Sequence, residues 1–238
     1  MNTQSPGASF DHRPIRARVT AVRQTVISAE LNGSIRELSV AEGTAFKRGD
    51  VLVKVDCGIY RAQQDKVRAD LDSAISRHKA IKRLAELESK GSLELELAEI
   101  EMRKARADFE MNKTQVAHCV IKAPFDGSVS EKHVDEQQYV QTGTPLLKII
   151  DDSLLQVEFI APSRYLRWLK VGAPFQLTID ETGRAYQATV ERFGADVDAV
   201  SQSIKVFAEL KNQHHELLSG MSGLVTLINP QTNRVTRE

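Results

Sequence analysis

The sequence lacks a long apolar run. Among its 238 residues, no window approaches the roughly 18 consecutive apolar residues that a membrane-spanning helix requires. The first 14 residues are polar, contain Pro6, Gly7 and Pro14, and have no apolar core of the kind found in export signals. We therefore expect a disordered leader over residues 1–14, and we expect neither export nor anchoring from this sequence by itself.

The chain also lacks an excess of either charge. Its 32 basic residues balance 32 acidic residues, so no overall field attracts nucleic acid or anionic lipid. Nucleic acid is therefore not an expected partner. With 41% apolar and 27% charged residues, the composition is that of an ordinary folded chain of about one to three small domains.

An ungapped internal repeat organises the chain. Residues 29–56 reappear 94 positions later as residues 123–150. In each half, glycines suited to tight turns precede short runs of alternating apolar residues, which predict strands. The matched pairs are Ala29/Ala123, Gly33/Gly127, Ser34/Ser128, Glu37/Glu131, Val40/Val134, Glu42/Glu136, Gly49/Gly143, Leu52/Leu146 and Lys54/Lys148. Because one half alone buries little apolar surface, we expect both halves to form one β-sandwich.

A proline-free helical segment, residues 57–118, separates the two halves and turns back near Gly91. Apolar residues on alternating three- and four-residue steps predict a coiled-coil hairpin, with each helix about 45 Å long. The first helix has one such line (Tyr60, Val67, Leu71, Ala74, Ile81, Ala85, interrupted by Gln64 and His78), and the second has two (Leu93, Leu97, Ile100, Ala107, Met111; and Leu95, Ala98, Met102, Ala105, Phe109, Val116). Two lines make a face wider than one partner helix needs, which favours self-association.

The periodicity changes again after Asp152. Several short strand patterns follow, together with a short predicted helix from Pro162 to Gly172, and this series is typical of a compact β-barrel. We assign residues 15–56 and 119–151 to a split sandwich, 57–118 to the helical hairpin, 152–228 to a barrel and 229–238 to a tail. The expected fold is mainly β, with an inserted α-helical hairpin, and elongated.

Two features each leave two interpretations open. Cys57 and Cys119 are too few for a disulfide scaffold and lack metal-type spacing, but they lie where the predicted helices leave and rejoin the sandwich. They form either a disulfide that clamps the base of the hairpin or two buried thiols. The hairpin tip is acidic, which suits either a solvated helix end or a basic partner; its carboxylates are Glu86, Glu88, Glu94, Glu96, Glu99 and Glu101.

No residue pattern points to catalysis. There is no nucleophile–base pair, glycine-rich phosphate loop or pair of carboxylates at strand ends, so we do not expect an enzyme. His214 and His215 are adjacent, so their side chains point in different directions, and no further ligands complete a metal site. We expect a solvated loop there, and no bound metal or cofactor.

Several strings resemble the membrane fusion proteins of the HlyD family, also called periplasmic adaptors. They are Gly33-Ser-Ile, Val40-x-Glu-Gly43 and Gly49-Asp-Val-Leu-Val-x-Val-Asp56 in the first half, Ile121-x-Ala-Pro-Phe-Asp-Gly127 and Gly143-x-Pro-Leu in the second, and Phe207-x-x-Leu-x-Asn212 and Leu218-x-Gly-Met221 in the barrel. The resemblance covers residues 19–228. It implies that the split sandwich is a lipoyl-like, or biotinyl-lipoyl-like, domain. A lipoyl carrier presents its modified lysine on the turn between the two halves, where this chain has helices, so the resemblance does not imply a carrier.

The resemblance also implies a function. Such adaptors link an inner-membrane transporter to an outer-membrane duct in tripartite efflux or secretion pumps. They self-associate into rings in the periplasm and are peripheral to the inner membrane. The alternatives are a lipoyl-like scaffold, or a solute- or metal-binding accessory protein, outside a tripartite pump.

Adaptors that dock on TolC-like ducts resemble one another at the hairpin tip. They share an Arg, a Leu four residues later and a Ser seven residues beyond that. Arg83 and Leu87 match, Gly91 falls where a turn glycine is common, and Glu94 occupies the serine position. With Leu93, these residues form the predicted docking tip.

Overall fold

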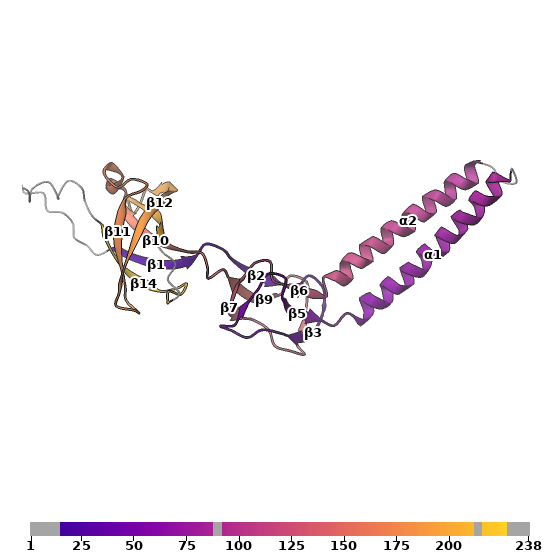
Figure 1. Cartoon of the computed structure of the whole chain (residues 1–238), viewed down its shortest axis with the longest axis horizontal. Coiled ribbons are helices and arrows are strands. Elements are labelled where there is room, and N and C mark those ends of the chain that lie inside the picture. Colours follow the sequence, from indigo (N-terminus) through magenta and orange to yellow (C-terminus); the bar gives the residue numbers. More distant parts are fainter. Residues whose placement is uncertain (1–14, 88–91, 212–215, 228–238) are drawn as a thin grey trace, which may run out of the picture. The chain divides into compact units, whose positions relative to one another are not determined.

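The computed structural model of the chain describes residues 15–87, 92–211 and 216–227. Contacts divide the chain into two compact units, one of residues 1–24 and 151–238 and the other of residues 25–150. The first unit contains a β-barrel, and the second combines a β-sandwich with two long helices (Figure 1). The fold is therefore mainly β with an inserted helical hairpin, as the sequence predicts.

Antiparallel strands close the barrel in the order β1, β10, β13, β12, β11, β14. They are β1 Ile15–Ala21, β10 Leu155–Pro162, β11 Pro174–Ile179, β12 Ala185–Asp198, β13 Ser203–Leu210 and β14 Ser222–Leu227, with the 3₁₀ helix η1 Ser163–Arg167 after β10. Alternate side chains along the strands are buried in a common core. In this core the rings of Phe159 and Phe175 meet edge to face, with centroids 5.3 Å apart.

The predicted domain boundary at the start of the chain is wrong. The repeat and strand patterns predict that residues 15–56 belong to the sandwich, but β1 pairs with β10 and β14 of the barrel. Its inward side chains Ala17, Val19 and Ala21 are buried in the barrel core. Without β1, strands β10 and β14 would each be an open sheet edge. Strand β1 pairs with both and satisfies their backbone hydrogen-bonding groups. Likewise, the helix predicted from Pro162 to Gly172 is only the 3₁₀ turn η1.

The sandwich has two four-stranded sheets, ordered β2, β9, β7, β4 and β6, β5, β3, β8. The strands are β2 Gln24–Ser28, β3 Gly33–Leu38, β4 Ala45–Phe46, β5 Val51–Val55, β6 Val120–Lys122, β7 Gly127–Lys132, β8 Tyr139–Val140 and β9 Pro145–Ile150. Strands β3, β4 and β5 belong to the first half of the repeat, and β7, β8 and β9 begin at the equivalent residues of the second half. Both halves contribute to one apolar core.

The two halves exchange a strand. Strand β4 of the first half pairs with β7 of the second, and β8 of the second pairs with β3 of the first. The registers are equivalent: Gly33 lies opposite Val140, and Gly127 lies opposite Phe46. Each half therefore completes the sheet of the other, which explains why neither would be stable alone.

Repeated glutamates reinforce this exchange. A carboxylate oxygen of Glu42 accepts a hydrogen bond from the Lys132 backbone N–H (2.8 Å), and one of Glu136 accepts from that of Leu38 (3.0 Å). These two contacts are equivalent in the repeat, and each joins one half to the other. The two matched Glu–Lys pairs form exposed ion pairs within their own halves, Lys54–Glu37 and Lys148–Glu131, and in each the hydrogen bond from lysine lowers the pKa of the glutamate.

Asp151 is a buried carboxylate at the start of the barrel unit, with a side chain 1% exposed. Its Oδ1 accepts hydrogen bonds from the hydroxyl (2.6 Å) and the backbone N–H (3.1 Å) of Ser153, and its Oδ2 pairs with the Arg23 guanidinium. Burial alone would raise the pKa of this carboxyl. The hydrogen bonds from Ser153 and Arg23 outweigh burial, so the pKa lies below its ordinary value.

Acid should therefore weaken the barrel through Asp151. A carboxyl whose pKa is lower in the folded state contributes stability above its unfolded pKa of about 4, and this contribution is lost as the pH falls through the folded pKa. We expect the urea midpoint of the barrel to fall between about pH 5 and about pH 2 more steeply in the wild type than in Asp151→Asn. Fluorescence of Trp168, the only tryptophan and part of this unit, reports the transition.

Asp196→Asn, at an exposed strand position, serves as the matched control and should keep the wild-type acid dependence. If Asp151→Asn had the same acid dependence as the wild type, the loss of stability in acid would not come from Asp151.

Candidate functional site: the helical hairpin

The hairpin connects two neighbouring strands of the sandwich. Helix α1, Gly58–Glu86, follows β5, and helix α2, Ser92–Ala117, leads into β6. Strands β5 and β6 are paired, with Lys54 opposite Val120, so the two helices leave the sandwich side by side. The hairpin thus occupies the place of an ordinary turn between paired strands, where a lipoyl carrier would present its lysine.

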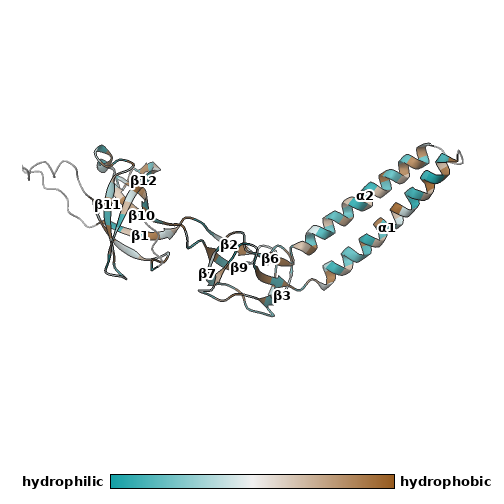
Figure 2. Cartoon of the chain, viewed as in Figure 1, coloured by the Kyte–Doolittle hydropathy of each residue, from teal (hydrophilic) through white to brown (hydrophobic). Residues whose placement is uncertain are grey.

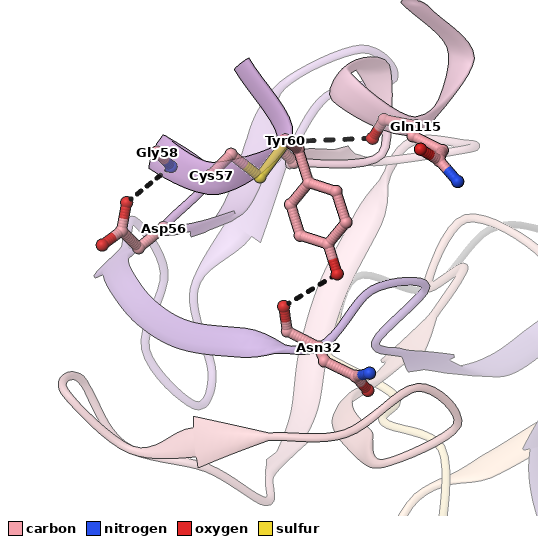
Figure 3. Close-up of a disulfide and its surroundings, with 7 residues drawn as sticks. Asn32, Asp56, Cys57, Gly58, Tyr60 and Gln115 are labelled. Atoms are coloured by element: carbon pink, nitrogen blue, oxygen red, sulfur yellow. Dashed lines mark hydrogen bonds between the residues drawn. A yellow bond between two sulfur atoms is a disulfide. The ribbon is translucent and has the colours of Figure 1, made fainter. Parts of the chain in front are cut away.

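A disulfide joins the two helices at this base (Figure 3). Cys57 and Cys119 are bonded, with their Cα atoms 6.0 Å apart. Their exposed fractions are only 2% and 1%, because a small apolar cluster covers them; its other members are Leu31, Tyr60, Val116 and Val120. The sequence leaves open whether the two cysteines form a disulfide or are buried thiols, and in the structure they form the disulfide.

Polar contacts also tie the base of the hairpin to the sandwich. The Tyr60 hydroxyl donates a hydrogen bond to the backbone oxygen of Asn32 at 3.3 Å (Figure 3). On the other helix, Nδ1 of His118 contacts the Glu30 carboxylate. No sequence pattern predicts these contacts, although Glu30 and Asn32 lie within the first repeat half, where polar residues precede a turn.

The predicted seam lies between the helices. Hydrophobic and hydrophilic residues alternate along both helices (Figure 2). In α1 the shielded positions are those of the predicted line, and in α2 they follow the line that contains Leu95, Ala98 and Met102. Few of these residues are fully buried: in the described parts of the helices, only Ala74, Ala98 and Asn112 are. The Asn112 amide donates to the backbone oxygen of Asp108 at 2.9 Å, so its buried donor is satisfied.

The other apolar line of α2 faces away from α1. We call it the outer stripe, and it consists of Leu93, Leu97, Ile100, Ala107 and Met111, interrupted by Lys104. Its large side chains are 65%, 56%, 45% and 58% exposed at Leu93, Leu97, Ile100 and Met111. Exposed apolar residues at coiled-coil spacing are typical of a surface that packs on another helix.

The predicted docking residues lie on both sides of the turn at the tip. Arg83 and Leu87 come from the end of α1, and Leu93 and Glu94 from the start of α2, whereas Gly91 lies outside the described residues. Leu87 and Leu93 are 69% and 65% exposed. The tip therefore presents two large apolar side chains flanked by a guanidinium and a carboxylate.

Other possible sites offer less. Across residues 15–87, 92–211 and 216–227, no three His, Cys, Asp or Glu side chains gather as a metal would require; His214 and His215 lie outside these ranges. The barrel has a cavity of about 750 Å³ beside β1 and β10. Of the charged residues on its wall, Arg16 pairs with Asp180 and Glu158 with Lys205.

Comparison with known families agrees with this architecture. The family described as RND MFP, barrel-sandwich hybrid domain, where MFP denotes membrane fusion protein, matches residues 23–152, more than half of the chain. The chain belongs to the RND membrane fusion proteins. The matched region is the split sandwich with its inserted hairpin. In the described part of this membrane fusion protein, neither helix has the length and apolar character needed to span a bilayer.

Individual proteins are similar over most of the chain. Nodulation protein NolF of Rhizobium meliloti (strain 1021) is 24% identical over 85% of this chain and 59% of its own length. The solvent efflux pump periplasmic linker SrpA of Pseudomonas putida is 24% identical over 86% of this chain and 58% of its own. The chain thus spans somewhat more than half the length of these relatives.

A solved structure has the same fold. The MacA–MexA chimeric protein, which contains the Pseudomonas aeruginosa MexA α-hairpin domain, superposes with a TM-score of 0.77 at 21% identity. The match covers 91% of this chain and 82% of the chimera.

We expect the disulfide to stabilise the hairpin selectively. A bond that spans 62 residues removes unfolded-chain entropy equivalent to about 4 kcal/mol. In the double variant Cys57→Ser/Cys119→Ser, helical circular dichroism should therefore be lost at lower urea concentration than in the wild type. Trp168 fluorescence, which reports the barrel, should not shift.

Reductant provides the control. It should convert the wild-type profile into that of the double variant and leave the double variant unchanged. A helical transition that is the same with and without the bond would show that the disulfide does not hold the hairpin.

Proposed function

We propose that this membrane fusion protein is a periplasmic adaptor that links an inner-membrane transporter to an outer-membrane duct in a tripartite efflux or secretion pump. The observation that carries the proposal is the hairpin of the family's split domain, which exposes Leu87 and Leu93 at its tip. Its role is mechanical: it joins two membrane components and helps to seal the path between them. The relative SrpA is named as a periplasmic linker of a solvent efflux pump.

The tip is the part that contacts the duct in this proposal. Two exposed leucines supply apolar surface, which loses its contact with water when a partner covers it. Arg83 and Glu94 flank these leucines and give the contact a charge pattern. Glu94 is a carboxylate where adaptors that dock on TolC-like ducts have a serine, so this position adds a negative charge to the proposed contact.

The proposed location is the periplasm, at the surface of the inner membrane. The Cys57–Cys119 disulfide supports it, because disulfides persist in oxidising compartments such as the periplasm and are rare in the cytosol. Several copies assemble as a ring in this proposal, with the outer stripe of α2 in contact with a neighbouring copy. Such a stripe at coiled-coil spacing suits a helix partner.

Photocrosslinking in the native host tests the proposal. An apolar photoreactive residue in place of Leu93 should capture an outer-membrane duct protein, identified by mass spectrometry. The same residue in place of Leu218, which is 61% exposed on the barrel unit, serves as the matched control and should not capture the duct. Capture from Leu93 of cytoplasmic proteins only, or of copies of the chain only, would contradict the adaptor role.

A further inference from the structure

The hairpin has two outer faces that differ in side-chain size. Seam residues face the partner helix, so residues half a helical turn away face outward. On α2 this face is the outer stripe of large apolar residues. On α1 the equivalent positions carry small residues, all exposed, interrupted by Lys66: Ala62, Ala69, Ser73, Ser76 and Ala80.

These two faces have complementary shapes. Large side chains on one helix pack well where a second helix has small ones, because the two backbones then approach closely. Ser76 does not prevent this, because its hydroxyl donates to the backbone oxygen of Asp72 at 2.8 Å and so needs no water as an acceptor when covered. The small face of α1 can therefore receive the outer stripe of another copy.

The two faces are also aligned along the hairpin. The Cys57–Cys119 bond at the base and the Arg77–Glu101 ion pair (2.9 Å) near the tip define which residues of α1 and α2 lie at the same level. By this alignment Ala80 lies level with Leu97. When two copies stand side by side without axial shift, Leu97 of one copy meets Ala80 of the next.

The charged residues beside the two faces are also complementary. Near the tip, α1 carries Lys79 and Lys82 and α2 carries Glu96 and Glu99, and none of these four makes an ion pair with another described residue. Counted from the seams, the lysines and the glutamates occupy equivalent positions, so they lie on the same side of the hairpin, opposite the Arg77–Glu101 pair. If α2 of one copy is placed beside α1 of the next, Glu96 and Glu99 of the first copy come to lie on the same side as Lys79 and Lys82 of the second.

We propose that the outer stripe of α2 packs on the small-residue face of α1 of a second copy, with Glu96 and Glu99 beside Lys79 and Lys82 of that copy. This contact is head-to-tail, so repeated addition gives a ring when the rotation between copies closes, and an open filament when it does not. The inference deepens the proposed function, on which it rests for the ring. It makes α1 and α2 the two halves of one interface and excludes a contact of α2 with α2.

Cysteine crosslinking of the full chain tests the pairing. A mixture of Ala80→Cys and Leu97→Cys copies should form crosslinked dimers on mild oxidation, and each variant alone should form few. The native cysteines are bonded and buried. Ser130→Cys, at an exposed sandwich position, mixed with either variant gives the background. Dimers from Leu97→Cys alone, or only background from the mixture, would overturn the proposal.

Charge reversal tests the complementarity independently. Lys79→Glu/Lys82→Glu and Glu96→Lys/Glu99→Lys should each weaken self-association by about tenfold or more, because each places like charges opposite one another. Mixing the two variants should restore association, since each then presents the charge that the other needs. Circular dichroism checks that the helices are intact. A mixture no better than its components would contradict the head-to-tail contact.

The two proposals fail separately. If the crosslinks between copies are absent while the probe at Leu93 still captures a duct, the inference is wrong and the adaptor role stands. If copies crosslink as expected while Leu93 captures no duct, the interface is correct and the adaptor role is wrong.

Discussion

The pairing of β5 with β6, closed by the Cys57–Cys119 disulfide, is the constraint on which the rest of the structure depends. It places both ends of a long insertion at one point of the sandwich, so that two helices leave together and run antiparallel. The exchange of β4 and β8 between the repeat halves keeps the sandwich intact around that insertion. Each repeat half needs the other to complete its sheet, and the hairpin depends on the complete sandwich for its position.

The hairpin itself is held together by little apolar burial. Its fully buried apolar residues among those described are the alanines Ala74 and Ala98, whereas burying one leucine contributes about 1.5–3 kcal/mol. Four large apolar side chains of α2 lie on the outside, in the outer stripe. A helix pair built in this way is stabilised at its base by a covalent bond and leaves its best packing surface for a partner, which suits an assembly component.

Periodicity and the repeat predict most of this fold because they record local constraints. The repeat defines the strands of the sandwich, and the three- and four-residue steps define the hairpin and its seam. They do not predict that β1 joins the barrel, since Ala17 and Val19 alternate equally well in either sheet and only the unfilled barrel edges decide. Nor do they decide between bonded and free cysteines, because that depends on the separation across β5 and β6. The small-residue face of α1 shows the same spacing as the seam, but small residues give no hydrophobic signal.

The most direct test of the account is electron cryo-microscopy of the assembly purified through this chain from its native host membranes. The account predicts a ring in which α1 of each copy lies against α2 of the next and the hairpin tips touch a duct protein. Single copies whose hairpins contact nothing, or a ring held together only by the barrels, would contradict it.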